Sequence, residues 1–130
     1  MKYLLDTNAV ISLLKDDRPG LARRLRQCSP GEVGISAVVA HELYFGAFKS
    51  QRVEANLAVV DRLAFEVLEL TRADGREAGR VRAGLARLGK PIGPYDVLIA
   101  GQALARKLVL VTGNSREFSR VEGLRWEDWE

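Results

Sequence analysis

The sequence predicts an α/β fold built on a central, mostly parallel sheet. Short apolar runs typical of strands alternate along the chain with longer segments in which apolar residues recur every three or four positions, as they do in helices. Strands that alternate with helices in this way form parallel sheets, because each strand returns to the sheet through a helical crossover. The chain has 130 residues and shows no internal repeat or linker-like stretch, so we expect a single domain spanning residues 1–130.

In the first half of the chain, two predicted strands each lead into helices. Ser36 has the residue type of a helix N-cap, and the three apolar residues Val39, Leu43 and Ala47 recur after it at i, i+4 and i+8 on one face. The expected elements are a strand at 2–5, helices at 8–15 and 21–26, a strand at 33–35, and helices at 36–49 and 53–63.

The second half repeats this alternation. Residues 65–70 alternate apolar and acidic side chains, as a strand does. Residues 97–101 are apolar on nearly every side, which predicts a buried helix that begins at Pro94. The expected elements are a strand at 65–70, helices at 73–88 and 94–107, and strands at 108–111 and 124–126, with Ala78, Val81, Leu85 and Leu88 facing inward.

Composition excludes several classes of protein. Hydrophobic residues make up 47% and charged residues 28% of the chain, the balance of an ordinary globular protein rather than a disordered one. Cys28 is the only cysteine, which rules out a disulfide scaffold and fits a reducing compartment, so we expect a cytoplasmic protein. No apolar run reaches the ~18 residues that a membrane span needs. Lys and Arg exceed Asp and Glu by 20 to 17, a weak indication of nucleic-acid binding.

Three acidic residues stand where the predicted fold places functional side chains. Asp6 ends the first strand, Asp96 lies in the first turn of the most buried helix, and Glu42 borders the apolar stripe of the 36–49 helix. Each has an ordinary explanation alone, as a helix cap or a solvated side chain. Together, at the end of a parallel sheet, they would repel one another unless a cation neutralised them. Oxygen ligands without Cys or His favour Mg²⁺ or Mn²⁺ over Zn²⁺.

A fourth oxygen-rich segment follows the strand at 108–111. Thr112, Asn114 and Glu117 all carry side-chain oxygens there, although Gly113-Asn114 also suits an ordinary turn. Because this segment lies at the carboxyl end of a strand, we expect it to enter the same crevice as Asp6 and Asp96.

Several motifs in order along the chain resemble one family, the PIN-domain ribonucleases, and in particular the VapC toxins of bacterial toxin–antitoxin pairs. These motifs cover nearly the whole chain. They are Leu5-Asp6-Thr7-Asn8, Ile35-Ser36 with Glu42-Leu43 and Gly46-Ala47, Arg82-Ala83-Gly84-Leu85-Ala86-Arg87, Gly93-Pro94-Tyr95-Asp96 with Ile99-Ala100-Gly101, Thr112-Gly113-Asn114-Ser115-Arg116-Glu117-Phe118, and Glu127-Asp128-Trp129.

The resemblance implies an α/β/α sandwich with an acidic pocket that holds Mg²⁺, or Mn²⁺ as a substitute. Asp6, Glu42 and Asp96 match the three main acids of that pocket, with Asp6 and Asp96 as direct metal ligands and Glu42 orienting water or a second ion. Many PIN domains have an Asp where this chain has Asn114, so either Asn114 or Glu117 completes the pocket.

The same resemblance implies an endoribonuclease toxin with defined partners. It would cleave RNA, with tRNA as the leading class of substrate, act as a homodimer, and be neutralised by a cognate antitoxin. An acidic pocket repels RNA, so basic side chains should surround it, and three arginines spaced by four residues, Arg72, Arg76 and Arg80, are candidates for phosphate contacts. A solvated, solubilising helix face explains these arginines equally well.

Two other functions remain open at the level of sequence. Residues 6–10 approach the nucleophile loop of haloacid-dehalogenase-like phosphatases, but Asn8 stands where a second Asp is expected. A PIN-like module that binds RNA or protein without cleaving is the second alternative, and Asn114 is its best support. The retention of Asp6, Glu42 and Asp96 argues against it.

Overall fold

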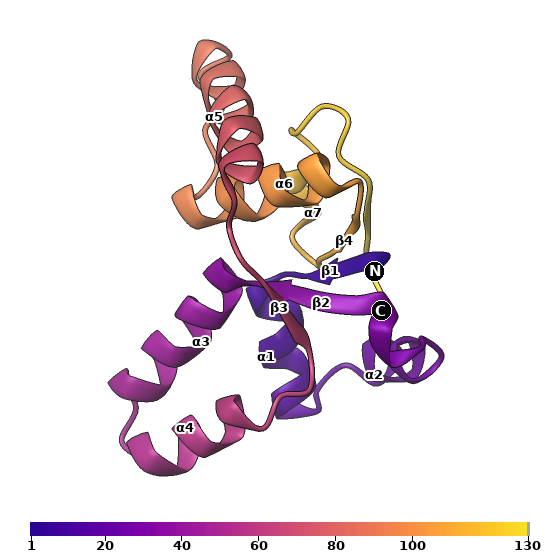
Figure 1. Cartoon of the computed structure of the whole chain (residues 1–130), viewed down its shortest axis with the longest axis vertical. Helices are drawn as coiled ribbons and strands as arrows, with labels where there is room; N and C mark the ends of the chain where they lie inside the picture. The colour runs from indigo at the N-terminus through magenta and orange to yellow at the C-terminus, as the bar shows by residue number, and fades with distance from the viewer. Residues whose placement is uncertain (130) are drawn as a thin grey trace.

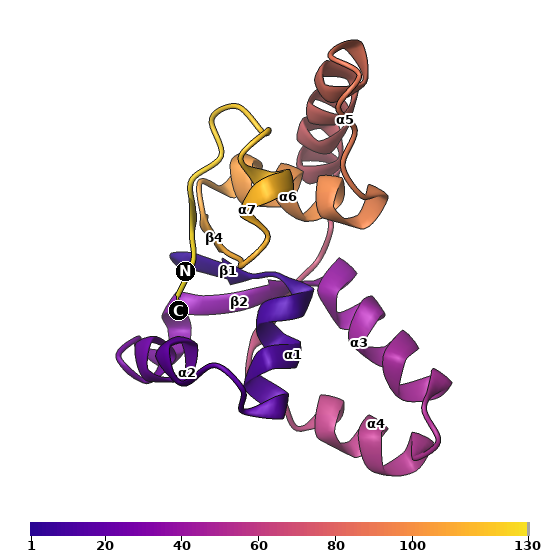
Figure 2. The ribbon, with the colours of Figure 1, turned by 180° about the vertical axis from the view of Figure 1, so that it is seen from behind.

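A computed structural model describes residues 1–129 and has a central sheet between two layers of helices (Figures 1 and 2). All five strands are parallel, which confirms the predicted α/β class. The helices of the first half of the chain lie on one side of the sheet, and those of the second half lie on the other. No helix within residues 1–129 is long and apolar enough to cross a membrane.

The strands are short and their order reverses at the first one. The sheet order is β3-β2-β1-β4-β5. The chain therefore moves from β1 in one direction to β2 and β3, and later returns to the opposite side of β1 as β4. Right-handed crossovers in opposite directions place their helices on opposite faces, which explains the two layers. The strands are β1 (Tyr3–Leu5), β2 (Val33–Ser36), β3 (Glu66–Leu68), β4 (Val109–Val111) and β5 (Trp126–Glu127).

The helices confirm the predicted segments with small shifts at their ends. They are α1 (Thr7–Lys15), α2 (Pro19–Arg26), α3 (Ala37–Lys49), α4 (Val53–Asp61), α5 (Arg72–Arg87), α6 (Pro94–Arg106) and α7 (Ser115–Phe118), with a 3-10 turn η1 (Pro30–Glu32). Two expectations were wrong in detail. Pro19 and Gly20 belong to α2 instead of preceding it, because proline suits a first helical turn. Leu88 is 69% exposed, since it caps the end of α5 where the helix extends beyond the sheet.

The predicted strand at 65–70 and the helix at 53–63 are shorter in the structure. Strand β3 is the sheet edge, so only Leu68 of its three residues is buried and Val67 is 48% exposed. Helix α4 ends at Asp61, two residues before the predicted end at residue 63. Both segments lack a neighbour on one side, so periodicity overestimates how far their regular structure extends.

The core lies around the two central strands and α6. Every residue of β1 and β4 is buried, because helices cover both faces of these strands. Helix α6 contributes the fully buried Ile99, Ala100 and Ala103. The first two belong to the apolar run at 97–101 that predicted a buried helix. This tightly packed centre fixes the end of β1 and the start of α6, the two places from which Asp6 and Asp96 project.

Helices α5 and α6 cross at a point of very close backbone contact. A Cβ atom added to Gly101 in α6 would lie 2.5 Å from the backbone Cα and N of Ala78 in α5. No side chain fits there, so glycine at 101 is required by the approach of the two helices. Their packing holds α5, which extends away from the sheet (Figure 1), onto the rest of the molecule.

A buried carboxylate joins the same two helices. Asp74 is 1% exposed and accepts hydrogen bonds from the Arg106 guanidinium at 3.0 and 3.3 Å and from Gln102 Nε2 at 3.1 Å. It also accepts the Thr71 N–H at 2.9 Å, while the Thr71 hydroxyl accepts the Asp74 N–H, which completes a capping box at the start of α5. Burial alone would raise the pKa of Asp74, but the hydrogen bonds from Arg106, Thr71 and Gln102 outweigh it and hold that pKa below 3.8.

The close helix crossing predicts opposite effects for two glycine-to-alanine changes. Gly101→Ala should destabilise the protein by about 1–3 kcal/mol, because the new methyl group overlaps backbone atoms of α5. Gly79→Ala should stabilise it by about 0.5–1 kcal/mol, because alanine is the better helix former and no atom lies within 4 Å of the added Cβ. Urea unfolding of both variants measures the two values, and equal stabilities would contradict the required contact at Gly101.

Replacement of the buried carboxylate should change both the stability and its pH dependence. We expect Asp74→Asn to lower the free energy of unfolding near neutral pH by about 1–3 kcal/mol, since Arg106 loses its charged partner. A carboxyl whose pKa is lowered on folding stabilises above its unfolded pKa, near 3.8, and loses that contribution as pH falls through its folded pKa. The difference between wild type and variant should therefore shrink below about pH 4. Urea titrations across this range would contradict the network if the difference stayed constant.

Candidate active site

The candidate residues gather at the carboxyl end of the sheet, where the strand order reverses. Asp6 directly follows β1, and Thr112 directly follows β4, its hydrogen-bonded neighbour. In open α/β sheets this reversal creates a crevice, because the chains leaving the two adjacent strands turn to opposite faces. The sequence-based placement of Asp6 and the 112–117 segment in one crevice is thus consistent with the observed topology.

Asp6 is held in place by the backbone and by a hydroxyl group. It is the N-cap of α1, with Oδ1 accepting the Ala9 N–H at 2.8 Å, and Oδ2 accepts a short hydrogen bond from the Thr112 hydroxyl. The residue is 3% exposed. Burial raises the pKa of Asp6, while these two hydrogen bonds oppose the increase. The cap explanation of Asp6 is correct, and it does not exclude a ligand role because each carboxylate oxygen can accept more than one contact.

Asp96 is the most perturbed acid of the cluster. It occupies the third position of α6, and its carboxylate folds back toward the N-cap, so that a Cβ on Gly93 would lie 3.2 Å from Oδ2. Burial, a hydrogen bond to Glu117 and the negative charges of Glu117, Asp6 and Glu42 together raise the pKa of Asp96 to about 7. The same interactions show that the four carboxyl groups are close enough to repel one another.

Glu117 and Asn114 both belong to the site region. Helix α7 forms the helical turn that carries Glu117 back toward Asp96. Asn114 donates to Glu117 Oε2 through Nδ2 at 3.2 Å, and its backbone N–H donates to Thr112 Oγ1 at 2.9 Å. Asn114 therefore positions Glu117, while Glu117 supplies a carboxylate next to Asp96. Which of the two completes the pocket stays a prediction.

Glu42 is tied to the first turn of α1 by a residue that the sequence analysis did not single out. Thr7 donates its hydroxyl to Glu42 Oε1 at 2.7 Å, across 35 positions in the chain. Arg18, which precedes α2, is a second site residue that the sequence analysis did not single out. Its guanidinium lies about where a side chain on Gly113 would be, and its positive charge opposes the burial that raises the pKa of Asp6. Thr7 follows Asp6 directly and could have been suspected, but no local pattern connects Arg18 with residue 113.

The donor set fits a hard divalent cation. The acidic side chains here offer carboxylate oxygens, with the Thr112 hydroxyl beside them and no Cys or His among these groups. A cation between the carboxylates would relieve the repulsion that raises the Asp96 pKa. Within residues 1–129, no three His, Cys, Asp or Glu side chains are arranged to hold a metal by themselves.

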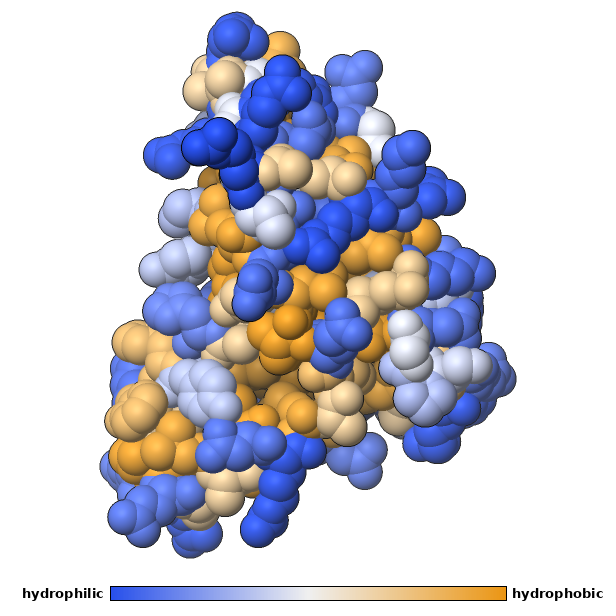
Figure 3. Space-filling view, viewed as in Figure 1, coloured by the Kyte–Doolittle hydropathy of each residue, from blue (hydrophilic) through white to orange (hydrophobic). Residues whose placement is uncertain are grey.

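The three arginines predicted to contact phosphates lie on the surface of α5. Arg72, Arg76 and Arg80 are exposed on α5, where hydrophilic side chains cover the upper part of the molecule (Figure 3), and Arg80 pairs with Glu77 at 2.9 Å. Their contact with RNA stays a prediction. A further arginine, Arg24 on α2, has a structural role, because it packs over the Trp129 ring at 4.9 Å and pairs with Glu127 in the C-terminal segment.

Comparisons with known proteins identify the family of the chain. The PIN domain family matches residues 3–124. The chain is 45% identical over 131 residues to the tRNA(fMet)-specific endonuclease VapC of Shigella flexneri, and 37% identical to ribonuclease VapC2 of Haemophilus influenzae. Both alignments cover 99% of this chain and 98% of the relative.

Solved structures give the same result. The fold matches the VapC-containing crystal structure of DNA-bound VapBC from Salmonella typhimurium with a TM-score of 0.94 at 42% identity, covering 100% of this chain and 99% of the other. VapBC-1 from nontypeable Haemophilus influenzae matches with a TM-score of 0.90 at 35% identity, covering 99% and 98%. An α/β/α sandwich with its acids at the reversal of the sheet, and matches over nearly the full length, show that the chain belongs to the PIN-domain family of ribonucleases, among the VapC proteins.

Proposed function

We propose that the acid cluster is the active site of a divalent-metal-dependent endoribonuclease, the toxin of a toxin–antitoxin pair, with tRNA as its substrate. The convergence of Asp6, Glu42, Asp96 and Glu117 at the reversal of the sheet carries this proposal, since a divalent cation would relieve the repulsion among these acids. Two relatives at 45% and 44% identity are named tRNA(fMet)-specific endonucleases, which favours an initiator tRNA as substrate. We take Mg²⁺ as the cation, with Mn²⁺ as a substitute.

The side chains of the cluster have separate roles in hydrolysis. Asp6 and Asp96 would hold the ion, because Asp6 is fixed by two hydrogen bonds and Asp96 by its place in the first turn of α6. When bound, a divalent cation supplies positive charge that makes nearby water more acidic and stabilises negative charge on phosphate oxygens. Thr7 engages one oxygen of Glu42, so the other can accept a hydrogen bond from the attacking water. The water adds to phosphorus as the ribose 3′ oxygen leaves.

An apolar cleft next to this site suits the antitoxin. It lies between α1, α3 and α4, has a volume of about 490 Å³, and is lined by Ile11, Leu14, Leu43, Val59 and Val60, with Glu42 also on its wall. An antitoxin segment that folds on binding could place apolar side chains in this cleft and a basic one beside Glu42. The structural relatives are VapBC complexes, which supports such a partner, and we propose that the toxin itself is a homodimer.

The two principal acids should be essential for cleavage. Asp6→Asn and Asp96→Asn should each remain folded, since asparagine retains the cap on α1 and the shape of both side chains. Each change should lower the cleavage rate about a hundredfold, equivalent to about 3 kcal/mol of lost transition-state stabilisation. Cleavage of total tRNA with Mn²⁺, read out by sequencing new 5′ ends, measures this. Near-normal rates from a folded variant would overturn the assignment, and a covalent phosphoryl group on Asp6 would indicate a phosphatase.

The fourth position of the pocket gives a separate prediction. Glu117→Gln should weaken Mn²⁺ binding and slow turnover, because it removes the carboxylate beside Asp96. Asn114→Asp should be tolerated or strengthen metal binding, since it adds a charge where the family usually has one. Calorimetric titration of Mn²⁺ into the wild type and both variants separates these outcomes. If Glu117→Gln binds metal and cleaves RNA like the wild type, the pocket has three acids and Glu117 is not part of it.

A further inference from the structure

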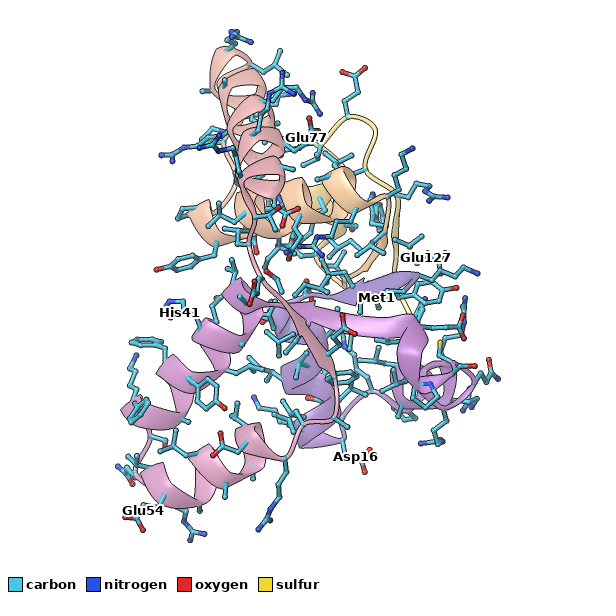
Figure 4. All side chains as sticks on the ribbon, in the orientation of Figure 1. Met1, Asp16, His41, Glu54, Glu77 and Glu127 are labelled. Atoms are coloured by element: carbon cyan, nitrogen blue, oxygen red, sulfur yellow. The ribbon has the colours of Figure 1, made fainter. Side chains whose placement is uncertain are left out.

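Two aromatic rings from different helices meet beside the acid cluster. Tyr95 directly precedes Asp96 in α6, and His41 directly precedes Glu42 in α3. Their ring centroids are 5.4 Å apart with an interplanar angle of 66°, an edge-to-face contact. His41 projects from the side of α3 that faces away from α1 (Figure 4). We call Tyr95 and His41 the rim pair; neither ring has a role in the hydrolysis described above.

The rim pair presents open ring faces to its surroundings. An edge-to-face contact covers only one of the four ring faces of a pair, so three stay free of the other ring. Tyr95 is 47% exposed and His41 is also exposed, which is unusual for two rings already in contact. Both side chains are therefore partly accessible to a planar group arriving from outside.

The exposed aromatic surface continues along α3. Phe45 lies one helical turn beyond His41 and is 59% exposed, and the Lys49 ammonium lies 5.6 Å from the centre of its ring. His41, Phe45 and Lys49 are spaced by four residues, so they share one side of the helix. Rings interleaved with a cation are the combination that single-stranded nucleic acids bind, because bases stack on the rings while the cation meets the phosphates.

The acid cluster itself explains why such a surface is needed. Four carboxyl groups repel a phosphodiester, and a single divalent cation neutralises only part of their charge. Basic side chains can offset this repulsion through the phosphates, and the uncharged parts of the substrate, of which the bases are the largest, can add binding energy that does not depend on charge. We infer that the rim pair is a stacking platform for an unpaired base next to the scissile phosphate, with Phe45 and Lys49 extending the track; this inference rests on the proposed function.

The platform also specifies a class of substrate. A base within a duplex has both faces covered by its neighbours and cannot stack on a protein ring, whereas bases in loops and single strands can. The structure therefore assigns Tyr95 and His41 as positioning residues that select unpaired nucleotides, such as those of a tRNA loop, over paired ones.

Ring-retaining and ring-removing variants test the platform. The probe is a single-stranded RNA of about 12 nucleotides that carries 2-aminopurine, whose fluorescence falls when it stacks, mixed with the protein in EDTA so that no cleavage occurs. Tyr95→Phe should quench the fluorescence like the wild type, and Tyr95→Leu should lose most of the quenching.

A kinetic assay gives a second measurement. In metal-dependent cleavage, Tyr95→Leu should raise KM about tenfold, within the range for loss of one stacked base, with little change in kcat. Tyr44→Leu is the matched control, because Tyr44 lies on α3 but bonds to Asp61.

The possible results separate this inference from the proposed function. Quenching that depends on Tyr95 supports the platform even if no RNA is cleaved with any metal, a result that would instead refute the proposed function. Metal-dependent cleavage with KM unchanged in Tyr95→Leu overturns the platform and leaves the proposed function intact. Absence of quenching by the wild type also overturns it. A change of molar mass in light scattering of Tyr95→Leu would show that a second copy covers the ring, which overturns the platform too.

Discussion

The fold depends on the position of β1 at the centre of a parallel sheet that grows in both directions from it. The strands of this sheet have only two to four residues each, so backbone pairing alone cannot hold them together. Stability comes from the two helical layers, and the reversal of strand order at β1 is what sends one crossover to each face. The same reversal opens the crevice in which Asp6 and Thr112 meet. One topological feature thus determines both how the short strands are covered and where polar side chains can gather.

The acidic side chains of the candidate site reduce the stability of this fold, because they are buried and repel one another. Asp6 is nearly fully buried, and Asp96 has a pKa of about 7 because of burial and three neighbouring acids. The protein restrains this repulsion with local hydrogen bonds: the Ala9 N–H and Thr112 hydroxyl for Asp6, and the Thr7 hydroxyl for Glu42. Asp74 shows the contrast within the same molecule, since a guanidinium pairs with it and its pKa is lowered. The structural carboxylate Asp74 pairs directly with a guanidinium, whereas the neighbours that raise the pKa of Asp96 are other acids, so a cation from solution would stabilise the site.

The parts of the chain that extend from this centre carry the surfaces proposed to contact other molecules. Helices α3 and α4 project on one side and α5 on the other (Figures 1 and 2). On α3, the inner side with Leu43 lines the apolar cleft proposed for an antitoxin, and the outer side carries His41 and Phe45. Because Glu42 lies between these two sides, an occupant of the cleft can act directly on the site.

The sequence by itself determined the α/β class, the helix caps and the identity of the candidate acids. These features follow from local causes: Ser36 caps the next helix, Pro94 begins α6, and the all-round apolar run at 97–101 can only be buried. Asp6 and Asp96 could be named because Asp6 directly follows β1 and Asp96 lies in the first turn of α6. The ends of β3 and α4 and the outward turn of Leu88 could not be predicted, because they depend on which neighbours a segment lacks.

Only the tertiary structure decided which side chains touch. The bond from Thr7 to Glu42 spans 35 positions, and the one from Thr112 to Asp6 spans 106. The approach of Glu117 to Asp96 required α7 to form, and the contact of Tyr95 with His41 joins helices from opposite layers. Periodicity reports the faces of one element and carries no information on distances between elements. Those distances are set by close packing, as at Gly101 and Ala78, where the absence of a single methyl group fixes how two helices cross.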